Sequence, residues 1–183
     1  MRPSRSLAPL IGPMLFACLF AVSAQGSAAS DDFDAGLQAF RTGDTNGALQ
    51  IWKRLANQGN STAQYNLGVV YERGKGVGAN IPQAMIWYRK AAENGRPDAQ
   101  NNLGVLYAEG RGIPRDLEKA YIWLTLSMAQ GYRPAVANRQ LVEVQLSEAQ
   151  RAAVKKRLWT YYANYVEPFQ GKDTAAAVLP TTP

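Results

Sequence analysis

The sequence contains no histidine, and its single cysteine, Cys18, lies close to the N-terminus. Histidine is the commonest general base and the commonest metal ligand, so its absence excludes Ser-His nucleophiles and most zinc sites. If the N-terminal segment is removed, the mature chain also lacks a thiol and can form no disulfide bond. Only carboxylates, lysine, tyrosine and serine remain as catalysts. This composition favours a binding function over an enzymatic one, and we expect no cofactor and no metal.

After its N-terminal segment the chain has no apolar run long enough to span a bilayer. Within that segment, Arg2 and Arg5 precede a mostly apolar stretch over residues 7–22, and small residues follow at Val22-Ser23-Ala24. This order predicts a secretory signal peptide over residues 1–24, cut near Ala24 to Ala29. The expected location is therefore the periplasm or the exterior of a bacterium, away from nucleic acid.

Two alternatives for the N-terminal segment are a retained anchor and a lipoprotein acylated at Cys18. The segment is short and interrupted by proline, which disfavours an anchor. Phe16 is bulky for a lipoprotein box, and the apolar run continues past Cys18, which disfavours lipidation.

The middle of the chain repeats with a period of 36 residues. Residues 63–71 and 99–107 share the pattern Ala-Gln-x-Asn-Leu-Gly-Val-x-Tyr, and each copy continues with a Gly-x-Gly loop and an Ala-x-Ile-Trp segment. Glycine closes each copy, at Gly95 and Gly131. A fixed period of this length is typical of helical arrays in which each unit is a pair of helices.

Apolar residues in each unit recur with helical spacing. Leu67, Val70 and Tyr71 stand at i, i+3 and i+4, so they form one stripe on a helix. Gly68 lies beside this stripe, and Ala84 is its small counterpart on the next helix. Their small size predicts a close approach of the two helices.

Helix ends are also marked in the sequence. Gly74 and Gly76 are expected to end the first helix of their unit, because glycine readily adopts the left-handed conformation. Asn80 is expected to cap a helix over residues 82–94, and Asp116 the equivalent helix of the next unit.

These residues resemble the signature of the Sel-one-like repeat, a relative of the tetratricopeptide repeat. The pattern Ala-x-x-x-Leu-Gly-x-x-Tyr-x-x-Gly-x-Gly, followed by Ala-x-x-Trp and glycine, is matched by residues 63–95 and 99–131. The resemblance implies an all-α fold, an α/α solenoid of helix pairs. It also implies a protein-binding scaffold without chemistry of its own.

Weaker units flank the two clear ones. The predicted solenoid covers residues 31–166, with units at about 31–60, 61–96 and 97–132, followed by a degraded unit and a C-terminal capping helix over 133–166. The first unit should contain helices over residues 32–41 and 45–58. A capping box at residues 147–150 opens the last helix, and residues 167–183 are expected to be disordered. The last helix carries one apolar stripe: Val154, Leu158, Tyr161, Tyr162 and Tyr165.

Two further patterns carry charge. Lys155-Lys156-Arg157 lies near aromatic residues, which can bind anionic lipid or polymer, although the same spacing suits an amphipathic cap. Asp31, Asp32 and Asp34 cluster at a helix start, where acidic residues suit the helix dipole. Glu72 and Glu109 are expected to be solvated surface charges.

The family resemblance also selects a binding face. In tetratricopeptide-like solenoids, fixed positions around the packing glycine of the first helix turn towards a concave groove. Phe33 and Phe40 could instead cap the first helix pair, an alternative that the sequence leaves open. The selected positions are Phe33, Leu37, Phe40, Arg41, Tyr65, Val69, Glu72, Arg73, Asn101, Val105 and Glu109.

The function expected from the sequence is an exported adaptor that binds a peptide or protein partner through these positions. The alternatives are a binder of anionic envelope surfaces through residues 151–157 and an envelope hydrolase that uses carboxylates alone. The partner's identity and the oligomeric state are not encoded in any pattern of the sequence.

Overall fold

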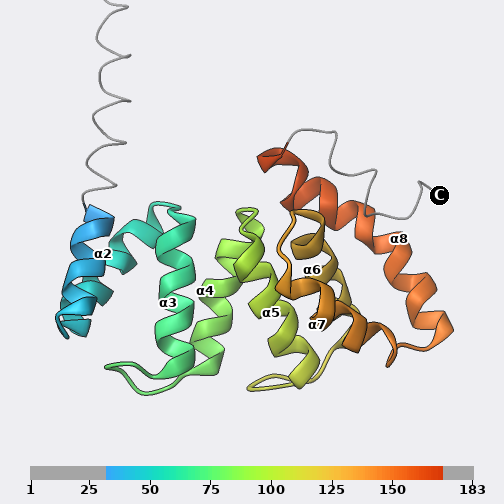
Figure 1. Ribbon diagram of the computed structural model, residues 1–183, viewed down its shortest axis with the longest axis horizontal. Helices are drawn as coiled ribbons and strands as arrows, with labels where there is room; N and C mark the ends of the chain where they lie inside the picture. The colour runs from blue at the N-terminus through green and yellow to red at the C-terminus, as the bar shows by residue number, and fades with distance from the viewer. Residues whose placement is uncertain (1–31, 171–183) are drawn as a thin grey trace, which may run out of the picture.

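Helices make up all the regular secondary structure in the part of the chain that the computed structural model describes, residues 32–170. A first helix over residues 32–41 precedes the labelled elements (Figure 1). These are α2 (Thr45–Asn57), α3 (Ser61–Arg73), α4 (Ile81–Glu93), α5 (Pro97–Glu109), α6 (Leu117–Ala129), α7 (Pro134–Glu143), α8 (Glu148–Tyr165) and the 3-10 helix η1 (Glu167–Phe169). The all-α fold expected from the repeats is confirmed. The predicted signal peptide and most of the predicted C-terminal tail lie outside the described residues.

The helix ends form as the sequence predicts. The side chain of Asn80 accepts a hydrogen bond from the Gln83 backbone N–H at 3.0 Å, and Asp116 accepts from Lys119 at 2.9 Å. Gly74 ends α3 in the left-handed conformation, with φ of 66°. Glycine takes this conformation without the steric cost that a Cβ would bring.

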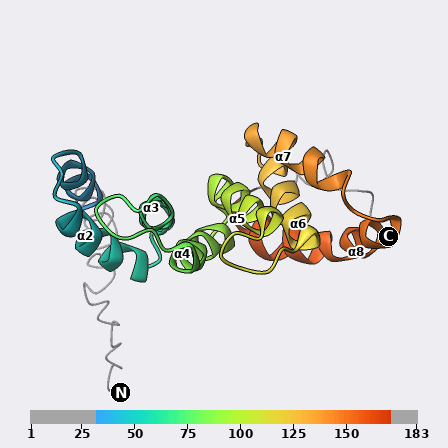
Figure 2. The ribbon, with the colours of Figure 1, turned by 90° about the horizontal axis from the view of Figure 1, so that it is seen from below.

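Successive helices pack as antiparallel neighbours in a row (Figure 1). α3 packs against α4 and α5 against α6, and α4 also packs against α5, so the core is continuous from one pair to the next. Seen from below, α5 and α7 lie on one side of the row, and α4 and α8 lie on the other (Figure 2). We call the surface of the first helices of the pairs, residues 32–41, α3, α5 and α7, the helix-A face. The opposite surface, over α4 and α6, is the helix-B face.

The packing glycines allow the helices of each pair to touch. A Cβ added at Gly68 would lie 2.5 Å from the Tyr88 ring, and one at Gly104 would lie 2.7 Å from Leu124. The same contact occurs in three units: Gly36 with Trp52, Gly68 with Tyr88, and Gly104 with Leu124. The contacted residues, 52, 88 and 124, are each 36 positions apart.

The second loop glycine of each unit makes a contact that the sequence pattern did not predict. Gly76 approaches Thr45, the first residue of α2, and a Cβ there would lie 2.5 Å from the threonine side chain. Gly112 approaches Ile81 at the start of α4 in the same way. Each Gly-x-Gly loop therefore rests on the preceding unit and fixes the stacking of neighbouring pairs.

A ladder of buried amides connects the turns at the other end of the helices. Gln64 donates to the Ala56 carbonyl at 3.0 Å, and Gln100 donates to the Ala92 carbonyl at 3.1 Å. Asn94 in turn donates to Gln64 at 3.0 Å. The Ala56 and Ala92 carbonyls also accept from the backbone N–H groups of Gly59 and Gly95. Each glutamine adds a second donor and so ties the start of its helix to the preceding turn.

The last long helix crosses the helix-B face. Every residue of α6 from 121 to 127 is buried, because α8 packs on the surface that α5 and α7 leave free. α8 begins with the predicted capping box, formed by Ser147 and Gln150. Val154 and Leu158 face the core, as their helical spacing predicts. At its end, the Gln100 side chain donates to the Tyr165 carbonyl at 3.4 Å, so this helix reaches back to the start of α5.

Candidate partner-binding face

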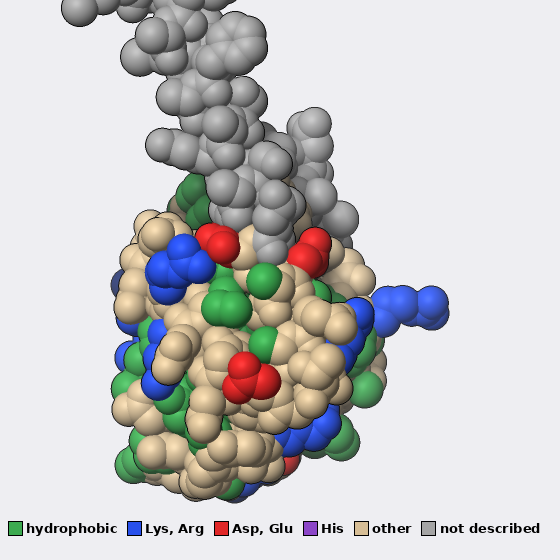
Figure 3. Space-filling model, turned by 90° about the vertical axis from the view of Figure 1, so that its left-hand side faces the viewer, with side chains coloured by type: hydrophobic (Ala, Val, Ile, Leu, Met, Phe, Trp, Pro, Cys, Tyr) green, Lys and Arg blue, Asp and Glu red, His purple; other side chains and the backbone are tan. Residues whose placement is uncertain are grey.

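The N-terminal part of the helix-A face is occupied by its own aromatic side chains. The rings of Phe33 and Phe40 lie 6.5 and 5.4 Å from the Trp52 ring, centroid to centroid, and Leu37 packs against the same core cluster. Arg41 is exposed at the end of this helix. These contacts correspond to the capping alternative. The N-terminal end, viewed in Figure 3, shows hydrophobic side chains in small groups among polar and charged ones.

In the centre of the helix-A face, Tyr65 lies between neighbouring units. Its ring is 5.8 Å from the Tyr88 ring, and the Arg96 guanidinium lies 5.0 Å from its centroid. Burial raises the pKa of Tyr65, and the negative charge of Asp98 raises it further. The Asn102 side chain on α5 acts in the opposite direction and lowers the pKa of Tyr65. Tyr65 thus joins α3 to the following pair and leaves only part of its surface for a ligand.

Glu72 is not the solvated surface charge that the sequence predicts. Its carboxylate accepts a hydrogen bond from the Tyr88 hydroxyl at 2.7 Å and forms an ion pair with Arg111 in the next Gly-x-Gly loop. Burial raises the pKa of Tyr88 above its ordinary value, and the hydrogen bond to Glu72 raises it further. Glu72 therefore connects α3, α4 and the loop before α6. The period alone could not reveal this contact, because residue 108, one period later, is alanine.

The C-terminal part of the helix-A face contains a depression of about 210 Å³ between α5, α6 and α7. Two of the selected positions, Val105 and Glu109, line it together with Leu141 of α7, which is 64% exposed. Sequence reasoning missed Leu141. The available signal was an apolar residue at an exposed position of a degraded unit.

The remaining selected positions differ in how much surface they offer. Arg73 is exposed at the end of α3, and Val69 is partly buried against the core. Asn101 is only 6% exposed and accepts a hydrogen bond from Asn138 at 2.9 Å. Asn101 and Asn138 stand one period after Tyr65 and Asn102. The selected set therefore contains both accessible side chains and side chains that hold neighbouring units together.

The basic segment of α8 separates its charges from its aromatic rings. Lys155 and Lys156 are exposed, whereas Arg157 forms an ion pair with Glu118 at 3.1 Å. Tyr161 and Tyr165 pack on Trp123 at centroid distances of 5.6 and 5.4 Å. The rings belong to the core, as an amphipathic cap requires. Lys155, Lys156 and the exposed Arg151 are left for an anionic surface.

The acidic cluster at the N-terminus lies at the start of the first helix. Asp32 forms an ion pair with Arg54 at 3.0 Å, Asp34 is exposed, and Asp31 lies outside the described range. Within residues 32–170, no group of three or more metal-ligating side chains comes together. In the same part of the chain, no helix has the length and apolar character needed to cross a bilayer.

Comparison with known proteins identifies the repeats. The family model of the Sel1 repeat matches residues 61–95 and 97–132. The fold is similar to that of a protective antigen of uropathogenic Escherichia coli strains that displays an SLR fold, with a TM-score of 0.74 and 28% identity over 91% of this chain. This chain spans only 36% of that protein.

A Sel1 repeat protein from Oxalobacter formigenes is also similar, with a TM-score of 0.58 and 27% identity over 67% of this chain and 97% of that one. No curated protein matches the sequence significantly. The helix pairs, the loop glycines and these similarities lead to one conclusion: the chain contains two Sel1 repeats, and its solenoid fold is similar to that of SLR proteins.

Proposed function

We propose that the protein is an exported adaptor of the bacterial cell envelope that binds a peptide or protein partner on its helix-A face. The Sel1-repeat fold is a scaffold for protein interaction. The observation that carries the choice of face is the depression beside Val105, Glu109 and Leu141. An apolar side chain as exposed as Leu141 beside a concave surface suits a partner residue that inserts there.

Binding is tested with partners captured from envelope extract by the purified protein and then titrated individually. Arg73→Ala and Leu141→Ser should each weaken a groove partner by about 1 kcal/mol or more, because hot-spot truncations have such effects. Val136→Ser on α7 is the matched control, since Val136 is exposed but does not line the depression. Tyr65→Ala should weaken binding too, although its contacts with Tyr88 require that its melting temperature be measured alongside.

The second candidate is binding of anionic lipid or polymer through Lys155 and Lys156, which are exposed on α8. Salt-titrated binding to anionic vesicles distinguishes it, because phosphate contacts weaken with ionic strength. If Lys155→Ala and Lys156→Ala abolish partner binding while Arg73→Ala and Leu141→Ser do not, the partner sits on α8 and the proposed face is wrong.

Export and the absence of catalysis belong to the same proposal. Export rests on the charged start, apolar stretch and small residues of the first 24 positions. N-terminal sequencing of the exported protein should place the new terminus near Ala24 to Ala29, and a terminus at Met1 or an acylated Cys18 would contradict it.

Purified protein should turn over neither β-lactams nor cell-wall fragments. A rate abolished by changing one carboxylate would overturn the adaptor proposal.

A further inference from the structure

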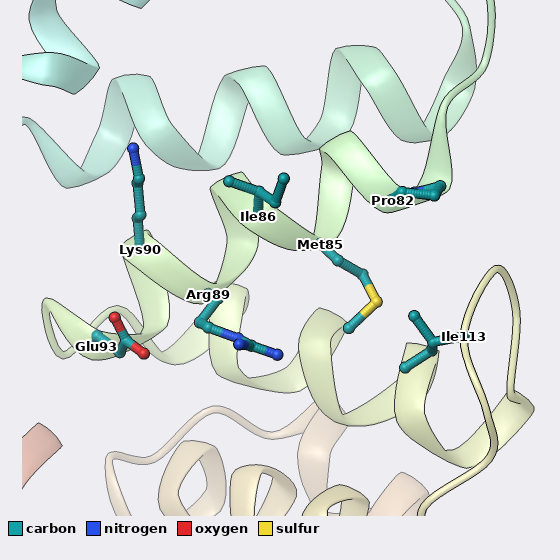
Figure 4. A pocket seen from close by; sticks show the side chains of 7 residues that line it. All are labelled: Pro82, Met85, Ile86, Arg89, Lys90, Glu93 and Ile113. Carbon is teal, nitrogen blue, oxygen red and sulfur yellow. The ribbon is translucent and has the colours of Figure 1, made fainter.

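A cavity of about 480 Å³ lies on the opposite surface, on α4 of the helix-B face. One side of α4 lines it, with Ile113 contributed by the loop before α6. Figure 4 shows Met85 and Ile113 pointing towards each other, and Ile86 and Lys90 extending from one side of the helix. Ile86 is 47% exposed, and it does not stand alone, because Met85 and Ile113 line the same cavity. The lining residues are Pro82, Met85, Ile86, Arg89, Lys90, Glu93 and Ile113.

The same surface one unit later is covered by a helix of the chain itself. Ile122 and Leu126 stand 36 positions after Ile86 and Lys90, and both are fully buried in the core cluster that also contains residues of α8. α8 packs directly on α6, with Tyr161 on Trp123 and Arg157 on Glu118. The molecule thus shows how a helix covers the outer surface of one unit, and it leaves the equivalent surface of the preceding unit open.

Charge indicates which kind of helix fits the open surface. Arg89 and Lys90 are exposed at the cavity, and neither forms an ion pair with any residue between 32 and 170. Glu93 is the single acidic side chain in the lining. On α6 the covered surface supplies a carboxylate, Glu118, and the covering helix supplies Arg157. On α4 the cavity instead offers two basic side chains, Arg89 and Lys90, so a covering helix that pairs with them carries carboxylates.

We propose that this surface of α4 is a second docking site, for an amphipathic helix of a partner protein with an apolar stripe flanked by acidic residues. The helix lies over α4 as α8 lies over α6. Its apolar side chains contact Met85, Ile86 and Ile113, and its carboxylates pair with Arg89 and Lys90. Amphipathic helices dock through anchor residues at i, i+4 and i+7. Pro82, Ile86 and Arg89 have the same spacing on α4, so they lie on one side of that helix. The site is separate from the partner-binding site proposed on the helix-A face.

The probe is a short helical peptide with leucines at i, i+4 and i+7 and glutamates on both flanks, compared with the same peptide carrying lysines. Fluorescence anisotropy with the purified protein should show binding of the glutamate peptide at least about tenfold tighter than of the lysine peptide. Ile86→Asp and Lys90→Glu should each weaken the glutamate peptide by about tenfold. Lys90→Glu should also improve binding of the lysine peptide, an effect that unfolding cannot produce.

Leu141→Ser is the control, because Leu141 lies on the helix-A face. It should leave peptide binding unchanged, whereas loss of binding in this variant alone would place the peptide on that face and overturn the α4 site. Failure of the glutamate peptide to bind would also overturn it. The proposal would also be overturned if the protein bound anionic vesicles, Lys90→Glu abolished this binding and the glutamate peptide did not compete with the vesicles. The occupant of the α4 surface would then be a membrane. Neither failure bears on the Arg73 and Leu141 tests of the helix-A face.

Discussion

Replacing Gly68 with alanine tests the close packing on which the repeat depends. The added Cβ would lie 2.5 Å from two carbons of the Tyr88 ring, closer than real Cβ atoms approach any neighbour. The ring is fully buried and held by Tyr65 and Glu72, so it has little room to move. Overpacking of this kind costs about 1–3 kcal/mol, and disturbing the ring's contacts costs about 1 kcal/mol more. Alanine recovers about 1 kcal/mol through its helix propensity.

The net expectation is a loss of about 1–3 kcal/mol of unfolding free energy, measured by urea denaturation with circular dichroism. Gly78→Ala is the matched control, because no atom lies within 4 Å of the Cβ that would be added there. It should change stability by no more than about 0.5–1 kcal/mol. In a Tyr88→Leu background the cost of Gly68→Ala should shrink by about 1 kcal/mol, since the two residues are in contact. A Gly68→Ala protein more stable than the parent would refute the packing argument, because helix propensity would then be acting alone.

Three further predictions follow from buried or charged residues. Leu67→Ala and Leu103→Ala, both at fully buried positions, should each lower the unfolding free energy by about 2–5 kcal/mol in denaturant titrations. Leu141→Ala at its exposed position should cost less than about 0.5 kcal/mol, and equal effects would contradict the assignment of the core. Gln100→Leu should cost about 1–3 kcal/mol because the buried side chain loses its hydrogen bonds with the Ala92 and Tyr165 carbonyls and with Gln130. Gln140→Leu on the exposed side of α7 should cost little, and a stable Gln100→Leu protein would remove the role given to the amide ladder. Burial acts to raise the pKa of Asp116, but its hydrogen bonds from Lys119 lower that pKa below the ordinary value of 3.8. The charge of Asp116 therefore stabilises the fold above pH 3.8, and this contribution is lost as the pH falls through the folded pKa. Asp116→Asn, which keeps the capping oxygen, should therefore be less stable than the parent at neutral pH, and the difference should shrink as the pH falls through the folded pKa of Asp116. A difference that does not change with pH would show that the charge is not the cause.

Much of the fold could be predicted because the repeat carries its own local signals. The stripe through Leu67 and the caps at Asn80 and Gly74 act within one helix or turn, so their effects can be derived from spacing and residue type alone. The period then places each helix against its partner. The prediction of an all-α solenoid followed from these signals and is confirmed.

Contacts between units were harder to predict because they join residues that differ from copy to copy. Glu72 pairs with Arg111 across two units, but one period later alanine stands in place of the glutamate. The Gly-x-Gly loop was interpreted as a helix end alone, although Gly112 also touches Ile81 of the preceding pair. Such contacts depend on how the pairs stack, which the pattern of a single unit does not contain.

The candidate site was predicted in outline only. The selection assumed that every unit presents the same positions to a groove, whereas Phe33 and Phe40 pack on Trp52. The open cavity on α4 could have been suspected from a comparison of two aligned helices. α6 carries the uncharged residues Thr125 and Leu126 where α4 carries Arg89 and Lys90, and a helix surface without charge is suited to being covered by another element.

Photo-crosslinking in living cells tests the proposed binding face most directly. A photoreactive amino acid placed at Val105, beside the depression on the helix-A face, is compared with one at Lys155 on the exposed side of α8. The adaptor account predicts a discrete adduct with one envelope protein from position 105, lost when Leu141→Ser is introduced, and none from position 155. Adducts from position 155 alone, unaffected by Leu141→Ser, would contradict it.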